Sequence, residues 1–204
     1  MRPFKTVTSV AAAIPQTDID TDIIFPARFL VTLDKKGLGK YAFYEWRHKR
    51  ESRDTFVLDK EPFSGAEILV VGEKFGVGSS REHAVWSLAD LGIRCIIAPS
   101  FGEIFYSNCF KNGVLPVTLP KDAHAHAMRA AQLGETLHVD LITNHVAIPG
   151  AEAISFEIPA DRRLALLNGL DEIGTILADH EHAIASFENR QRQSAPWLFS
   201  DTDF

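Results

Sequence analysis

A glycine-rich stretch with two serines, an arginine and a histidine carries the clearest chemistry of the chain. It reads Gly72-Glu73-Lys74-Phe75-Gly76-Val77-Gly78-Ser79-Ser80-Arg81-Glu82-His83. Its glycines allow a sharp turn and a close approach of the backbone to a ligand. An apolar run precedes it and a helical pattern follows at 84–92, so the hydroxyls and the guanidinium come at a predicted helix N-terminus, which favours anions. We therefore expect a site that binds a carboxylate or phosphate beside proton-transfer groups.

A helix-capping role competes with this interpretation. Ser79 and Glu82 have the Ser-x-x-Glu spacing of a capping box, in which the two side chains satisfy free backbone N–H groups at a helix start. Capping explains these two residues. It does not explain the second serine, Arg81 and the three glycines that accompany them. From the residues alone, an anion site and a plain cap both remain open.

Three other functions of glycine loops are excluded by spacing. A phosphate-binding Walker A loop needs a glycine where Val77 stands, five residues after Gly72. The dinucleotide fingerprint needs its third glycine where Arg81 stands. The nucleophile elbow of serine hydrolases, Gly-x-Ser-x-Gly, would have to start at Gly78, and Glu82 stands where its closing glycine is needed.

The sequence predicts no metal site. Cys95 and Cys109 lie in apolar surroundings, which is typical of buried thiols, and two cysteines are too few for the usual four ligands of an iron–sulfur cluster. Two i, i+2 histidine pairs would diverge on a helix and are predicted to be surface residues: His124 with His126, and His180 with His182.

Composition excludes several classes of partner. The chain has 204 residues, 46% of them hydrophobic, and a formal net charge of −6, which disfavours binding to nucleic acid through a basic surface. It contains neither a membrane-spanning run of apolar residues nor a signal peptide, so we expect a cytoplasmic protein without membrane contact.

The predicted elements make an α/β protein with a mixed sheet and flanking helices. Strands and helices alternate from 68 to 119, which favours parallel strands covered by helices. Further strands are expected at 5–14, 55–58, 136–142, 145–148 and 154–158, and further helices at 121–132, 159–168 and 179–192. Asp179 is the expected N-cap of the last helix. We predict one domain over 1–204, with a substrate loop at about 27–50 and a C-terminal helix plus tail at about 179–204.

Several motifs together carry a resemblance to a known family. Their order and spacing resemble the small subunits of 3-isopropylmalate dehydratase, the swivelling domain of the aconitase superfamily. The motifs are Asp20-Thr21-Asp22-Ile23-Ile24-Phe25-Pro26, Gly76 to Ala84, Ser100 to Phe105, Asn112-Gly113-Val114-Leu115-Pro116, and Asn168 to Gly174. Lys74 and Val77 depart from the family pattern, outside the Ser-Ser-Arg core.

The resemblance implies a fold and an activity. The fold would be a swivelling β/β/α domain of the aconitase C-terminal type. The activity would be that of a hydro-lyase of leucine biosynthesis, which interconverts 2-isopropylmalate and 3-isopropylmalate by dehydration and rehydration. A [4Fe–4S] cluster would act as Lewis acid on a separate large subunit, with no cofactor on this chain. The two subunits would form a heterodimer or heterotetramer.

The resemblance also assigns roles by position. Ser79 would be the base that removes a proton from the carbon beside a carboxylate. Ser80 and Arg81 would bind substrate carboxylate, the arginine through its two-pronged guanidinium. Thr21 and Asp22 would lie at the edge of the same site.

A further position is assigned to specificity. Relatives acting on substrates with a third carboxylate place an arginine in the loop after the first motif, where this chain has Val31. An apolar side chain suits an isopropyl group and leaves a carboxylate unpaired, which is costly. Arg28 lies nearby in the sequence. The alternatives are a related hydro-lyase of the methylated malate, citraconate or homoaconitate type, and a non-catalytic assembly subunit.

Overall fold

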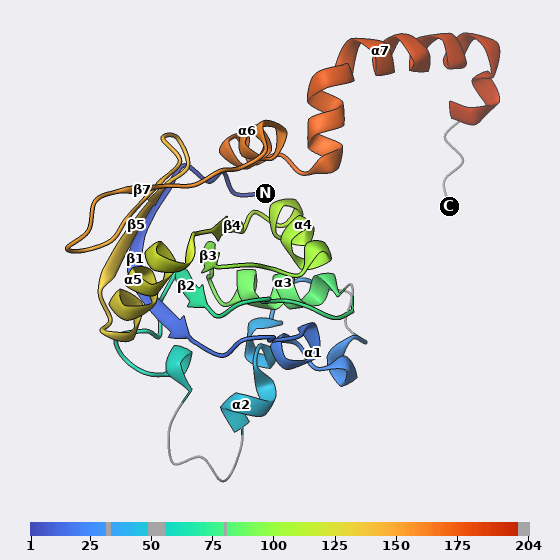
Figure 1. Ribbon diagram of the computed structural model, residues 1–204. Coiled ribbons are helices and arrows are strands. Elements are labelled where there is room, and N and C mark those ends of the chain that lie inside the picture. The colour runs from blue at the N-terminus through green and yellow to red at the C-terminus, as the bar shows by residue number, and fades with distance from the viewer. Residues whose placement is uncertain (32–33, 49–55, 80, 200–204) are drawn as a thin grey trace.

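A single mixed sheet organises the chain (Figure 1). The computed structural model describes residues 1–31, 34–48, 56–79 and 81–199. In this part of the chain the sheet has the strand order β4-β3-β2-β1-β5-β6-β7. The strands are β1 (Thr6–Ile14), β2 (Ile68–Val71), β3 (Cys95–Ala98), β4 (Leu115–Thr118), β5 (Thr136–Asp140), β6 (His145–Ala147) and β7 (Ile154–Ser155). The α-helices are α1 (Thr21–Ile24), α2 (Tyr44–His48), α3 (Glu82–Asp90), α4 (Glu103–Lys111), α5 (Lys121–Gln132), α6 (Ala160–Asn168) and α7 (Glu172–Ser194).

Strand β1 joins two differently built halves of the sheet. Its residues 11–14 pair in parallel with β2, and β3 and β4 continue this parallel half. Its residues 6–10 pair antiparallel with β5, which begins the meander through β6 and β7. The prediction of a mixed α/β sheet is therefore confirmed.

The parallel half has a core on each face, as its continuous apolar strands require. Side chains alternate along β2, so Ile68 and Val70 join the core beneath α5. Leu69 and Val71 join the second core, against α3 and α4. All four are fully buried. Burial of each such side chain contributes roughly 1.5–3 kcal/mol. The covering of both faces leaves the carboxyl ends of these strands as the place where loops can carry polar groups.

The glycine loop emerges from the carboxyl end of β2 and packs directly on the start of α4. Phe75 bridges to Phe101, and the N–H of Gly102 donates to the carbonyl of Phe75 at 2.9 Å. Gly76 has a φ of +75°, and a Cβ there would lie 2.2 Å from Cγ of Phe105. Glycine is therefore required at position 76 both by its dihedral angle and by the ring beside it.

The last helix begins earlier than the sequence predicted. Helix α7 begins at Glu172 because the Asp171 side chain accepts from the N–H of Gly174 at 2.7 Å, so the prediction of Asp179 as N-cap was wrong. Asp179 lies inside the helix, beside a kink at His180, where φ is −126°. The helix predicted to start at Asp179 therefore coincides with a kink inside α7, not with the beginning of the helix. Figure 1 shows α7 running away from the sheet.

Two further predictions concern short segments. The strand predicted at 55–58 was wrong, because Val57–Asp59 form a 3₁₀ turn, η3, and residue 55 lies outside the described part. The centre of the Phe56 ring lies 5.2 Å from that of Phe43. None of the described helices is long and apolar enough to cross a membrane.

One histidine differs from its predicted surface position. His124 is buried, and its Nε2 lies 2.7 Å from the carbonyl oxygen of Val71. The cause is the packing of α5 on β2, which faces this position toward the sheet. His126, His180 and His182 are exposed, as predicted. Burial lowers the pKa of His124, although the Val71 carbonyl and the charge of Glu73 act in the opposite direction.

We expect Gly76→Ala to destabilise the protein more than Gly37→Ala. Gly37 has a matching φ of +77° but nothing within 4 Å of its Cβ position. Its substitution should cost only the left-handed conformation, about 1–2 kcal/mol. At Gly76 the collision with Phe105 should add about 1–3 kcal/mol. Urea unfolding of both variants measures this difference, and equal losses would contradict the required contact.

The buried His124 should make stability fall in mild acid. The ordinary pKa of histidine is about 6.5, so in the unfolded chain this side chain takes up a proton below that pH. In the folded chain the pKa is lower, so the proton binds only at a lower pH. The free energy of unfolding should therefore decrease as the pH drops from about 7.5 to about 5.5. The variant His124→Gln should show a shallower decrease in urea titrations, whereas His126→Gln should retain the wild-type slope.

Candidate functional site

Two segments that lie far apart in the sequence meet at the carboxyl end of the parallel strands. The N–H of Gly76 donates to the carbonyl of Ile19 at 2.7 Å, and the N–H of Thr21 donates to the carbonyl of Val77 at 3.0 Å. Asp20 and Val77 form a parallel bridge between these bonds. The Asp-Thr-Asp motif and the glycine loop therefore run side by side, as members of one site would.

Ser79 is exposed, and its backbone carbonyl is held by two hydrogen bonds. Its carbonyl accepts from the hydroxyl of Thr21 at 3.0 Å and from the N–H of Arg81 at 2.8 Å. Thr21 is only 2% exposed, so it supports the loop from beneath. Among the described residues, the Ser79 hydroxyl makes no hydrogen bond and points to no structural partner. Ser80 lies outside the described residues.

Arg81 forms an ion pair with Asp22, through Nη1 and Oδ1. The arginine side chain is 20% exposed and the aspartate side chain 51%. Asp22 lies in the first turn of α1, whose N-cap, Asp20, accepts from the N–H of Ile23 at 2.7 Å. A guanidinium has five N–H donors, so the pair leaves Arg81 able to bind a second anion. The two motifs thus hold the cation of Arg81, two residues after Ser79 in the sequence, against Asp22.

The capping-box interpretation was wrong. Helix α3 begins at Glu82, its N-cap is Arg81, and no side chain among the described residues caps it. The Glu82 carboxylate does not reach back over the helix start but accepts from Nδ2 of Asn112 at 2.7 Å. The chain turns into the helix two residues later than the box requires, so Ser79 lies before the cap. The type and exposure of Ser79 are therefore not explained by helix capping.

The loop with Val31 is placed by stacked aromatic rings. Phe29, in the 3₁₀ turn η1 (Ala27–Phe29), stacks on Tyr41 with ring centres 4.2 Å apart. Val31 follows this turn and is 87% exposed. Arg28 pairs with Glu45 at 2.5 Å, which balances its charge. The contacts that join Thr21, Asp22, Ser79 and Arg81 do not include Val31, so it belongs to a second, neighbouring element.

The cysteines do not fit a cluster site. Cys95 and Cys109 are fully buried, and burial raises the pKa of both thiols above the usual range, so they stay protonated. Among the described residues there is no group of three or more His, Cys, Asp or Glu side chains that could hold a metal ion. The described part of this chain therefore offers no fit for a [4Fe–4S] cluster.

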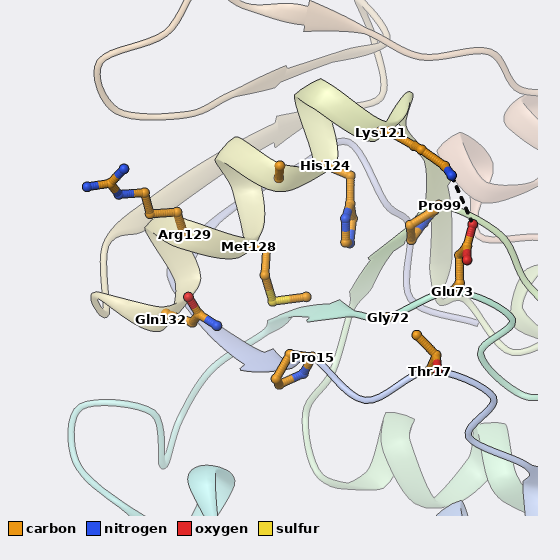
Figure 2. A pocket seen from close by; sticks show the side chains of 11 residues that line it. Pro15, Thr17, Gly72, Glu73, Pro99, Lys121, His124, Met128, Arg129 and Gln132 are labelled. Atoms are coloured by element: carbon orange, nitrogen blue, oxygen red, sulfur yellow. Dashed lines mark ion pairs between the residues drawn. The ribbon is translucent and has the colours of Figure 1, made fainter.

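A cavity of about 590 Å³ lies beside the glycine loop but away from the predicted residues (Figure 2). It is bounded by the carboxyl ends of β1, β2 and β3, and by His124 and Met128 of α5. Glu73 and Lys121 form a 3.9 Å ion pair there. None of the predicted site residues lines this cavity. The predicted site residues that the structure describes therefore lie outside this cavity, and Ser79 to Arg81 are called the serine loop from here on.

Comparison with known proteins gives the same family throughout. The family model of the aconitase C-terminal domain matches residues 1–122, and that of the C-terminal domain of the 3-isopropylmalate dehydratase small subunit matches residues 179–201. A 3-isopropylmalate dehydratase small subunit from Paramagnetospirillum magneticum is 46% identical, over 97% of this chain and 100% of its own. One from Granulibacter bethesdensis is 48% identical, over 97% and 96%.

A solved structure agrees in fold. The 3-isopropylmalate dehydratase (leuD) of Methanocaldococcus jannaschii superposes with a TM-score of 0.64 and 25% sequence identity, covering 90% of this chain and 99% of that one. The resemblance carried by the motifs is confirmed by this fold and by relatives that match over their whole length. The chain belongs to the family of 3-isopropylmalate dehydratase small subunits, within the aconitase superfamily.

Proposed function

We propose that this chain provides the proton-transfer and carboxylate-binding half of a 3-isopropylmalate dehydratase. The enzyme would interconvert 2-isopropylmalate and 3-isopropylmalate by removing and adding water in leucine biosynthesis. The observation that carries the proposal is Ser79 itself: an exposed hydroxyl without a capping role, on a backbone held by Thr21 and next to Arg81. The names of the full-length relatives supply the substrate.

Arg81 would bind a carboxylate of the dicarboxylate substrate. Its guanidinium is permanently charged, and a fork-shaped contact orients a carboxylate as well as attracting it. Asp22 keeps the side chain in place in the free subunit. A carboxylate at position 22 repels a substrate anion, so its contribution to binding would be the orientation of Arg81. Ser80, which adjoins both Ser79 and Arg81 in the sequence, would donate to the same carboxylate.

Ser79 would take the proton from the carbon next to that carboxylate and return it in the reverse direction. A serine alkoxide is very unfavourable in water. The guanidinium of Arg81 and the N–H groups at the start of α3 would provide positive charge for the ionised oxygen, which would lower the cost of ionising it. A preorganised donor of this kind contributes roughly 10²–10³ in rate.

The remaining chemistry would come from the partner. The described residues do not fit a metal cluster, so we propose that the [4Fe–4S] cluster belongs to the large subunit. The small-subunit names of the relatives support such a partner. We further propose one swivelling domain over 1–204, and a heterodimer or heterotetramer in the cytoplasm, in which the exposed serine loop is covered by the partner chain.

Val31 would select the branched alkyl group. It is apolar and exposed, and the nearby Arg28 is engaged by Glu45. A third substrate carboxylate would thus find no free arginine at either position. This arrangement favours the isopropyl substrate over the substrate of a homoaconitate-type relative.

Substitution Ser79→Ala should abolish turnover without unfolding the protein. In a complex reconstituted with the large subunit, kcat for 2-isopropylmalate should fall about 10²–10⁴-fold, the usual contribution of a general base. The free energy of unfolding should change by less than about 0.5 kcal/mol, because the side chain is exposed.

The rival assembly-subunit hypothesis makes the opposite prediction for the same variant. It expects normal turnover and, if Ser79 capped a helix after all, a loss of about 1 kcal/mol. Stability is measured in urea on the isolated chain, which should itself have no dehydratase activity. Turnover by the isolated chain would refute the two-subunit account.

Substitution Val31→Arg should shift specificity from isopropylmalate toward homoaconitate. The arginine would pair with a third carboxylate, and contact with an apolar group would leave its charge desolvated and unpaired, so the ratio of the two kcat/KM values should change by about tenfold or more. Val31→Leu is the matched control and should keep the isopropyl preference. An unchanged ratio in Val31→Arg would remove Val31 from the specificity site.

A further inference from the structure

Lys35 follows Val31 in the sequence and contacts helix α3 and the C-cap of helix α4. Its Nζ donates to Oδ1 of Asn112 at 3.1 Å. The same ammonium lies 4.7 Å from the centre of the Trp86 ring. Trp86 belongs to α3, and Asn112 is the C-cap of α4. One side chain thus joins three segments that are distant in the sequence.

Asn112 relays this contact to the first residue of α3. Its Nδ2 donates to Oε1 of Glu82 at 2.7 Å and to the carbonyl of Asn108 at 2.9 Å. The amide is oriented by its neighbours, because its oxygen faces an ammonium and its nitrogen a carboxylate. Glu82 follows Arg81 directly and begins the helix. The chain of contacts from Lys35 therefore ends at the residue next to the proposed substrate-binding arginine.

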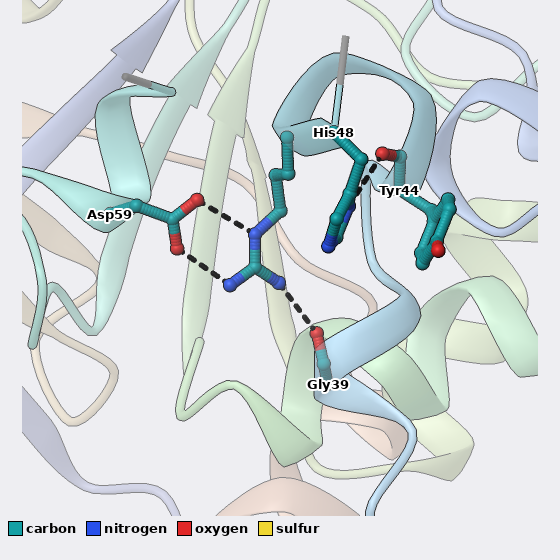
Figure 3. A network of polar contacts seen from close by, with 5 residues as sticks. Gly39, Tyr44, His48 and Asp59 are labelled. Atoms are coloured by element: carbon teal, nitrogen blue, oxygen red, sulfur yellow. Dashed lines mark hydrogen bonds and ion pairs between the residues drawn. The ribbon is translucent and has the colours of Figure 1, made fainter. Parts of the chain in front are cut away.

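A second tether holds the same segment at the other end of α3. The N–H of Gly39 donates to Oδ2 of Asp90, the last residue of α3, at 2.7 Å. The carbonyl of Gly39 accepts from Arg47 at 3.0 Å, and Arg47 binds both oxygens of Asp59 at 2.8 and 2.6 Å (Figure 3). This end is braced by a network, whereas the Lys35 end depends on one exposed side chain.

We propose that Lys35 is a positioning residue for the reaction. It latches the segment that starts at residue 34, which follows Val31 in the sequence, onto Trp86 of α3 and onto Asn112, which in turn binds Glu82 in the first turn of α3. Together with the stack of Phe29 on Tyr41, the latch would restrain Val31 relative to Arg81, so that alkyl group and carboxylate are bound in one geometry. The inference rests on the proposed function in its claim about substrate, but the latch itself is a property of the isolated chain. Since Lys35 is exposed, loss of its contacts acts on the loop and leaves the fold intact.

Hydrogen exchange of the isolated full chain tests the latch without activity. In Lys35→Met, the amides of residues 34–37 should exchange about 3- to 10-fold faster, because local opening becomes easier. Lys36→Met is the matched control, since it removes the same charge one residue along, and it should exchange like the wild type. Lys35→Arg should restore slow exchange. Wild-type exchange in Lys35→Met would overturn the proposal.

Kinetics of the reconstituted complex test the consequence for substrate. Lys35→Met should raise KM for 2-isopropylmalate about fivefold with kcat within about twofold of wild type, as expected when binding geometry but not proton transfer is impaired. Lys36→Met should leave both constants unchanged. An unaltered KM in Lys35→Met, or a fall in kcat alone, would overturn the positioning role. If even the wild-type complex fails to turn over 2-isopropylmalate, the proposed function fails, and hydrogen exchange still decides the latch.

Discussion

The candidate site depends on one constraint, the contact of bare backbone at Gly76 with the elements around it. The N–H of Gly76 is bonded to Ile19, and its Cα faces the ring of Phe105. A Cβ on Gly102 would lie 2.4 Å from the Gly76 carbonyl oxygen, so the approach is tight on both sides. This packing brings the loop after β1, the loop after β2 and the start of α4 to one point. The pairing of Asp22 with Arg81 follows from that arrangement of the backbone.

The electrostatics of the site follow from that meeting. Arg81 comes from the glycine loop and Asp22 from the first turn of α1, and they pair although 59 residues separate them. The pair is only partly exposed, so screening by solvent is incomplete and the guanidinium keeps a set direction. Ser79 is the neighbour of this cation, and its carbonyl, not its hydroxyl, takes up the structural hydrogen bonds. The hydroxyl of Ser79 therefore remains available for the proposed proton transfer.

The loop residue Ser79 is exposed and does not line the cavity beside α5, as expected if a partner chain completes the site. The 590 Å³ cavity lies on the α5 side, whereas the serine loop borders the core formed with α3 and α4. A base that ionises needs exclusion of water and nearby positive charge. This chain provides the charge through Arg81, and in the proposed complex the partner surface would exclude the water. Ser79, which is exposed in this chain, would then be covered in the proposed complex.

Much of the architecture follows from local sequence. The apolar runs at 68–71 and 95–98 predicted buried parallel strands, and the alanine-rich pattern predicted α5 at 121–132, because hydrophobic period and helix propensity act over a few residues. The Ser-Ser-Arg motif indicated an anion site, and its companion motifs indicated the family. These signals depend on residue type and spacing alone, so no tertiary information was needed.

Where the sequence left several roles open for a residue, only the tertiary structure decided between them. The spacing of Ser79 and Glu82 is equally good for a capping box, but Asn112 takes Glu82 and the helix starts later. The sequence predicted His124 to be a surface residue, but the packing of α5 on β2 buries it against the Val71 carbonyl. Thr21 supports the backbone of Ser79, because its hydroxyl reaches the Ser79 carbonyl. Each outcome depends on a partner between 30 and 58 residues away, and a local pattern contains no information about such partners.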